Sequence, residues 1–83
     1  MNKLLIELYI PAVNQTYDIY IPTSLKFHEI EAMLISAAVE LSNGTFAASS
    51  DTVICDRFSG QLLDVNKFAL ELGLQNGSML MLI

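Results

Sequence analysis

The side chains with the greatest chemical potential in this chain are the thiol of Cys55 and the imidazole of His28, its single cysteine and single histidine. Such a pair works as nucleophile and base only within hydrogen-bond reach, and a third group normally orients the base. We expect Cys55 in a short strand and His28 at a helix start, on the side away from the core. A small thiol in a strand is commonly a buried apolar group. The sequence therefore predicts an inert Cys55 and a solvent-facing His28.

The remaining polar residues do not form a recognisable catalytic or metal-binding pattern. A zinc site needs about four clustered His or Cys ligands, and the four glycines are isolated at turns, which excludes a phosphate-binding loop. Glu29, Glu31 and Glu40 are expected on a helix, where a solvated face is the simpler interpretation and partner recognition the alternative. The other acidic residues of the second half are dispersed: Asp51, Asp56, Asp64 and Glu71. We expect no enzyme activity, no cofactor and no metal.

Composition indicates one small folded domain that covers residues 1–83. Hydrophobic residues make up 53% of the chain and charged residues 16%, which excludes intrinsic disorder. Nine acidic and four basic residues give a net charge of −5, which argues against binding to nucleic acid or anionic lipid. No apolar run approaches the roughly 20 residues that span a bilayer, and Glu7 interrupts the one stretch that resembles a signal peptide. One cysteine cannot form an internal disulfide, so we expect a cytoplasmic protein without membrane insertion.

Two strands open the chain. Lys3 to Ile10 alternates between apolar and mixed positions, which is the period of a half-buried strand. A turn over Pro11 to Gln15 leads to a second alternating strand, Thr16 to Ile21, which Pro22 ends because it lacks a backbone donor.

A helix is expected next, from about Lys26 to Leu41, ending before the signal Asn43-Gly44. Its core face would contain Phe27, Ile30, Met33, Leu34, Ala37, Ala38 and Leu41.

After the helix we expect a polar connector over 44–51, anchored by Phe46, and a third strand over 52–57. A turn at Ser59-Gly60 should lead to a short fourth strand over 61–63. A helical turn over 66–72 closed by Gly73, a buried Leu74 and a last strand over 78–83 complete the expected order. The inward residues of the third strand are not evident from its pattern.

This order, ββαβ(β)(short helix)β, predicts an α+β protein with a mixed sheet of about five strands packed on one helix, the β-grasp arrangement. Phe58-Ser59-Gly60-Gln61-Leu62-Leu63-Asp64 and the segment from Leu70 to Leu82 resemble the corner and closing strand of ubiquitin-like proteins. Among these proteins, the chain resembles the bacterial YukD-like family associated with type VII secretion. That likeness rests on Ile21-Pro22, the pattern of 25–34, Gly60-Gln61-Leu62-Leu63, and Asn76-Gly77-Ser78 before an apolar strand, together with the length of the chain.

The resemblance implies a cytosolic ubiquitin-fold protein that is not conjugated and that accompanies or regulates a type VII secretion machine. Its partners would then be secretion components, and no catalytic residue carries over. A conjugated modifier or sulfur carrier needs a carboxyl-terminal diglycine, whereas this sequence ends in Leu82-Ile83. We expect no conjugation unless residues are missing from that end.

Two apolar surfaces are candidates for protein contact. If Leu80 and Leu82 face the core, Met79, Met81 and Ile83 emerge on the outer face of the sheet beside Leu5. Methionine suits adaptable interfaces, and exposed apolar patches commonly mark them. The second surface is a helix stripe of Ala32, Ile35 and Val39, with coverage by the 45–51 connector as the alternative.

We therefore expect a non-enzymatic module that acts by docking to another protein. The alternatives are a self-associating structural subunit, such as a homodimer that buries these surfaces, and the modifier or sulfur carrier described above.

Overall fold

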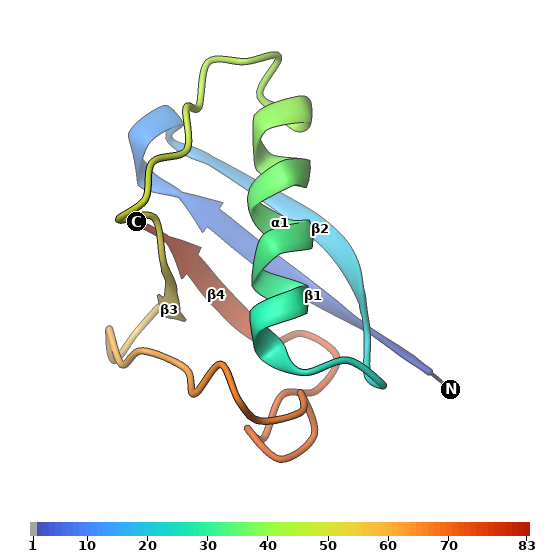
Figure 1. The fold of residues 1–83 in the computed structure, drawn as a ribbon. Coiled ribbons are helices and arrows are strands. Elements are labelled where there is room, and N and C mark those ends of the chain that lie inside the picture. The colour runs from blue at the N-terminus through green and yellow to red at the C-terminus, as the bar shows by residue number, and fades with distance from the viewer. Residues whose placement is uncertain (1) are drawn as a thin grey trace.

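The computed structural model describes residues 2–83, which form one sheet and one long helix (Figure 1). In chain order the elements are β1 (Lys3–Ile10), the 3-10 helix η1 (Pro11–Val13), β2 (Gln15–Pro22), α1 (Phe27–Leu41), β3 (Ile54–Asp56) and β4 (Met79–Leu82). The periodicities of the first strands, the long helix and the last strand thus correctly predict these elements, with small shifts at their ends.

The sheet is mixed, with the strand order β2-β1-β4-β3. The pairs β1–β2 and β3–β4 are antiparallel, and the central pair β1–β4 is parallel. Helix α1 crosses one face of this sheet, as Figure 1 shows. The predicted α+β arrangement of a mixed sheet on one helix is confirmed.

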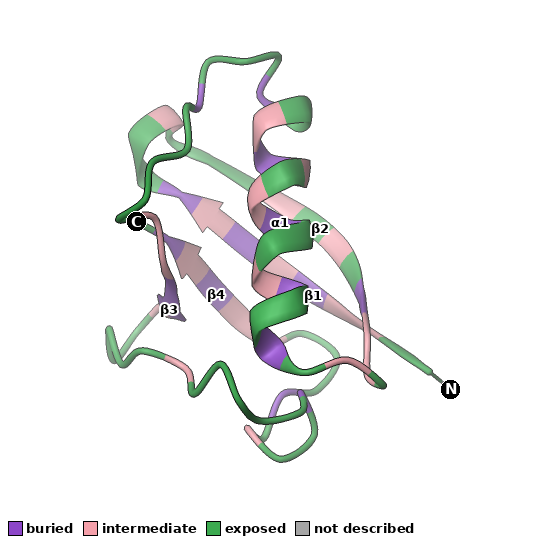
Figure 2. Cartoon of the chain, in the orientation of Figure 1, coloured by how far each residue is buried: buried purple, intermediate pink, exposed green. Residues whose placement is uncertain are grey.

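The core lies between α1 and the inner face of the sheet (Figure 2). Alternate residues of β1 are fully buried, and so are helix residues three or four positions apart, as expected for one face of each element. The main core residues are Ile6, Leu8, Ile10, Ile21, Phe27, Ile30, Leu34, Ala38, Phe46, Ile54, Ala69, Leu74, Leu80 and Leu82. The predicted anchoring by Phe46 and burial of Leu74 are confirmed.

The buried stripe of α1 is narrower than the sequence predicts. Met33 and Leu41 were expected in the core, but they are 47% and 48% exposed. Ala37 is only half-buried. A single helix on a four-stranded sheet covers the sheet along one line of contact, so residues at the flanks of its apolar face stay in solvent.

The expected fourth strand is reduced to one bridge, between Leu62 and Cys55. The Asp56 N–H also donates to the Gln61 carbonyl (2.9 Å), but Leu62 itself is exposed and gains little from longer pairing. The sheet therefore has four strands in the described residues rather than about five.

The segment 66–72 forms successive turns instead of a helical turn. Most of its hydrogen bonds span three residues, for example from the Gly73 N–H to the Leu70 carbonyl (3.1 Å). The Phe68 N–H is taken by the side chain of Glu71, which removes it from any helical ladder. Gly73 closes the segment with a φ of +79°, as predicted for a helix-stop glycine.

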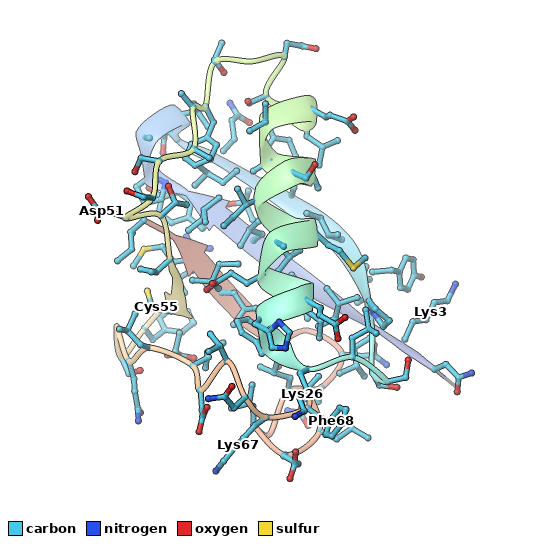
Figure 3. All side chains as sticks on the ribbon, in the orientation of Figure 1. Lys3, Lys26, Asp51, Cys55, Lys67 and Phe68 are labelled. Carbon is cyan, nitrogen blue, oxygen red and sulfur yellow. The ribbon has the colours of Figure 1, made fainter. Side chains whose placement is uncertain are left out.

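The same segment holds the start of α1. Lys26 is the N-cap residue, and its side chain makes no capping hydrogen bond. Instead, the Phe27 N–H donates to the Lys67 carbonyl (2.8 Å) and the His28 N–H donates to the Val65 carbonyl (2.9 Å). In Figure 3, Lys26, Lys67 and Phe68 accordingly lie together at this end of the helix. Two of the backbone donors that a helix start leaves unpaired are satisfied in this way.

Candidate interaction surface on the outer face of the sheet

The outer face of the sheet is the face opposite α1, and its composition follows from strand register. In β1 the residues between the buried ones point outward: Leu5, Glu7 and Tyr9. Across the sheet, Leu5 is opposite Tyr20 of β2, and Tyr9 is opposite Met81 of β4. Leu80 and Leu82 are buried in the core, so Met79 and Met81 emerge on the outer face, as the alternation of the last strand predicts.

The four residues expected on this surface lie on neighbouring strands. Leu5, Met79 and Met81 are partly exposed, and Ile83 is 54% exposed. Ile83 directly follows β4 and continues its pairing with the β3 segment. It exchanges two backbone hydrogen bonds with Val53, the residue before β3 (2.8 and 2.9 Å). The four side chains thus stand on a hydrogen-bonded framework.

A loop fixes β1 against β4 at this surface. The Leu5 N–H donates to the side-chain oxygen of Asn76 (2.8 Å), and the Leu5 carbonyl accepts from the Gly77 N–H (2.8 Å). Gly77 has a φ of +90°, which a residue with a side chain rarely adopts. The Asn76-Gly77 pair therefore sets the position of Leu5 relative to Met79.

Polar and aromatic residues on the same face were not predicted. Glu7 lies directly opposite Asp18 in the β1–β2 register. The Lys3 Nζ lies 4.4 Å from the centre of the Tyr20 ring, and the Arg57 guanidinium lies 4.4 Å from the centre of the Tyr9 ring. Both distances are typical of cation–π contacts.

The register of β1 and β2 is what brings these residues together. Alternation places Glu7 and Asp18 on outer positions, but a shift of one residue in the turn changes every partner. The turn contains a 3-10 helix followed by Asn14 in the left-handed conformation (φ 50°). The residues Pro11 to Gln15 do not determine this turn geometry, so the sequence does not fix which residue of β2 lies opposite Glu7. The sequence shows only that Glu7 and Asp18 each occupy an outer position of their strands.

The helix stripe is divided between solvent and core. Ala32 is exposed, whereas Ile35 and Val39 are half-buried and pack against the core. One turn before Ile35, the carboxylate of Glu31 accepts a hydrogen bond from the Ile54 N–H (3.1 Å), which ties β3 to this side of α1. Two of the three side chains of the stripe are consequently engaged with the core of the domain.

Cys55 lies deep in the sheet. It is fully buried, pairs with Met81 and forms the bridge to Leu62. Its thiol makes one long contact, donating to the Met81 carbonyl at 3.7 Å. Burial raises the pKa of this thiol, and the negative charge of Asp56 adds to the effect. A protonated, enclosed thiol is a poor nucleophile, and His28 is exposed on the helix, as predicted.

Within residues 2–83, no group of three His, Cys, Asp or Glu side chains could hold a metal ion, and no pocket is present. Over the same described residues, no helix has the length and apolar character to cross a membrane. The candidate site is accordingly an open surface made of sheet-face side chains.

Comparison with known proteins supports the fold through structure. No protein-family model and no curated protein matches the sequence. The ubiquitin-like domain of EccD1, a type VII secretion protein of Mycobacterium tuberculosis, matches with a TM-score of 0.76 and 15% identity, covering 100% of this chain and 99% of that domain. The EccD5 ubiquitin-like domain of Mycobacterium xenopi matches with a TM-score of 0.81 and 12% identity, covering 100% and 94%.

A ubiquitin of Caldiarchaeum subterraneum is also similar, with a TM-score of 0.68 and 11% identity, and the match covers 98% of this chain and 91% of that protein. Identities this low carry the fold and not the role. The chain has the ubiquitin-like β-grasp fold, and its structural neighbours include ubiquitin-like domains of type VII secretion proteins.

Proposed function

We propose that this chain is a non-conjugated, ubiquitin-like protein-interaction module that serves as an accessory or regulatory cytosolic component of a bacterial type VII secretion system. Two kinds of support converge on this proposal. The sequence resembles the YukD-like family, and the fold is shared with the EccD1 and EccD5 ubiquitin-like domains. The module would act by docking, without catalysis.

The single observation behind the docking mechanism is the apolar surface on the outer face of the sheet. Leu5, Met79, Met81 and Ile83 stand on adjacent strands, and no helix covers this side of the sheet in residues 2–83 (Figure 1). Burying such side chains against a partner stabilises a complex by roughly 25 cal/mol for each Å² of apolar area removed from water. About 800 Å² on each partner is typical of a specific complex.

The helix stripe of Ala32, Ile35 and Val39 takes a secondary place in this proposal. Ile35 and Val39 already pack against the core, and the exposed member, Ala32, has the smallest side chain of the three. The stripe would extend the interface of a partner that reaches around the β3 side of the domain.

A capture experiment from cells that contain the native secretion system tests the proposal. The protein serves as bait beside a Met81→Asp/Ile83→Asp double variant, and captured proteins are identified by mass spectrometry. We expect the wild type to retain type VII secretion components and the double variant to lose them, because two carboxylates would be desolvated in the interface. Circular dichroism and cooperative unfolding should show that the double variant is still folded.

Two further variants make the result interpretable. Ile83→Asp alone changes a residue that is 54% exposed, and it should weaken capture without disturbing the core. Leu70→Asp changes an exposed leucine (64% exposed, against 54% for Ile83) in the loop before β4, and we expect capture to be unaffected. Undiminished capture by the folded double variant would exclude the sheet face as the docking site. Capture of no secretion component by the wild type would refute the assignment to secretion.

A further inference from the structure

Two carboxylates lie side by side on the β2–β1 half of the outer sheet face. Glu7 of β1 is paired with Asp18 of β2 on one side and with Met79 of β4 on the other, so the three side chains form one row. Directly opposite residues on one face have Cβ atoms about 4.5–5.5 Å apart. Glu7 is partly exposed and Asp18 is exposed, and both therefore face any partner that covers Met79.

The cations of this face are engaged with rings. Lys3 lies over Tyr20 and Arg57 lies over Tyr9, each 4.4 Å from the ring centre. These two cation–aromatic pairs lie on either side of the row formed by Asp18, Glu7 and Met79. The β2–β1 half of the face consequently carries two negative charges between two cation–aromatic pairs.

Several other carboxylates of the chain stabilise its own backbone. Those that accept backbone hydrogen bonds in residues 2–83 are Glu31, Asp56, Asp64 and Glu71. Each fixes a turn, a loop or the start of β3. Glu7, Asp18, Glu29, Glu40 and Asp51 are not among them, and of these only Glu7 and Asp18 lie directly opposite each other in a strand pair.

Opposed like charges are a local conflict in this fold. Identical charges directly across an antiparallel pair destabilise it, and conflicts between local sequence and fold are expected mainly at functional sites. A basic side chain from another molecule would resolve this one, because it could sit between two carboxylates that are already held in register. The net charge of −5 would also speed the approach of a basic partner.

Resting on the proposed function, we infer that the outer face binds a protein segment that presents an arginine or lysine beside aliphatic side chains. The basic group lies between Glu7 and Asp18, and the aliphatic groups lie on Leu5, Met79 and Met81. Apolar burial supplies most of the affinity, and the charge selects which segment binds.

Selection from a random-peptide phage library tests this inference with a defined probe. Wild-type protein is immobilised, and enriched peptides are synthesised and titrated by fluorescence anisotropy. We expect enriched peptides to place Arg or Lys next to Leu, Ile, Val or Met. Binding of a selected peptide should weaken about tenfold in Glu7→Gln/Asp18→Asn, a typical effect of removing partly desolvated charges, and should also weaken between low salt and about 0.5 M salt.

Control variants separate this inference from the proposed function. Asp51→Asn removes one exposed carboxylate from the turn before β3, outside the strands that carry Glu7 and Asp18, and it should leave binding unchanged. Met81→Asp/Ile83→Asp should abolish binding of the same peptides. If peptides are lost in that double variant but show no basic enrichment, the basic anchor is wrong and the sheet-face interface stands. Three results would overturn the inference: selected peptides that bind both double variants as tightly as the wild type, enrichment of acidic peptides, or enrichment of no peptide.

The stability of the free protein gives an independent reading. Glu7→Gln relieves the repulsion from Asp18, so the urea midpoint should rise at low salt, and the gain should shrink as salt screens the pair. An unchanged or lower midpoint would mean that the pair is not in conflict, which removes the reason for a basic partner.

Discussion

At the scale of residues, environment decides which side chains are chemically available. Cys55 is the one thiol, and strand pairing on both sides encloses it between Met81 and Leu62. Its burial could be predicted from residue type, because small thiols in strands are commonly buried. Its exact partners could not, because they depend on the register between β3 and β4. Glu7 and Asp18 were overlooked for the same reason, since only register makes them neighbours.

The raised pKa of Cys55 predicts a loss of stability in alkaline solution. The unfolded chain releases the thiol proton near pH 9.0, whereas the native thiol keeps it to higher pH. Above that pH the unfolded state binds fewer protons than the native state, so the free energy of unfolding falls as pH rises. One proton sets an upper limit of about 1.4 kcal/mol per pH unit on this slope.

Urea titrations from about pH 8 to about pH 10 measure this slope. Cys55→Ala is the matched control, because it removes the thiol and leaves every other ionisable group in place. The variant should start less stable and should lose stability more slowly with pH. Parallel curves for the two proteins would contradict the assignment to the thiol.

At the scale of elements, periodicity predicts long segments well and short ones poorly. The strands β1 and β2 and helix α1 contain enough repeats to define a face. The stretch Gln61-Leu62-Leu63 has too few residues to show alternation, and only one bridge forms there. Met33 and Leu41 show a second limit, because the apolar face of a helix can be wider than the line along which it touches a sheet.

The loop before β4 depends on one side chain that joins two elements. Asn76→Ala removes the acceptor of the Leu5 N–H, which lies 2.8 Å away. We expect the free energy of unfolding to fall by about 1 kcal/mol, the usual net contribution of one hydrogen bond. Chemical denaturation measures the change. Asn66→Ala is the control, because that exposed side chain lies in the same loop, and the expected change there is within about 0.5 kcal/mol. Equal effects would show that the Leu5 bond is unimportant.

At the scale of the whole molecule, the one helix and one sheet of residues 2–83 leave the outer face of the sheet without a second layer. The sequence predicts that some apolar surface stays exposed, because 53% of the residues are hydrophobic and a chain of 83 residues is too short to bury them all. It also predicts which side chains of β4 point outward. The charges that share this face bear on whether two copies can meet there, and this question separates a self-associating subunit from a module that awaits a different partner.

We expect the isolated protein to be monomeric at micromolar concentration. A face-to-face pair of copies would bring Glu7 and Asp18 against the same two residues, and each chain already carries a net charge of −5. Light scattering at increasing concentration should give the 9.2 kDa mass of one chain at low salt. A stable mass of twice that value, reduced to one chain by Ile83→Asp, would instead support the homodimer.

The order in which the chain is made matters for the first turn of α1. The acceptors for the Phe27 and His28 N–H groups are carbonyls of Lys67 and Val65, which leave the ribosome nearly forty residues later. Until Val65 and Lys67 have been synthesised, these two amides can pair only with water, as the first amides of an uncapped helix do. The native capping of α1 therefore requires the second half of the protein.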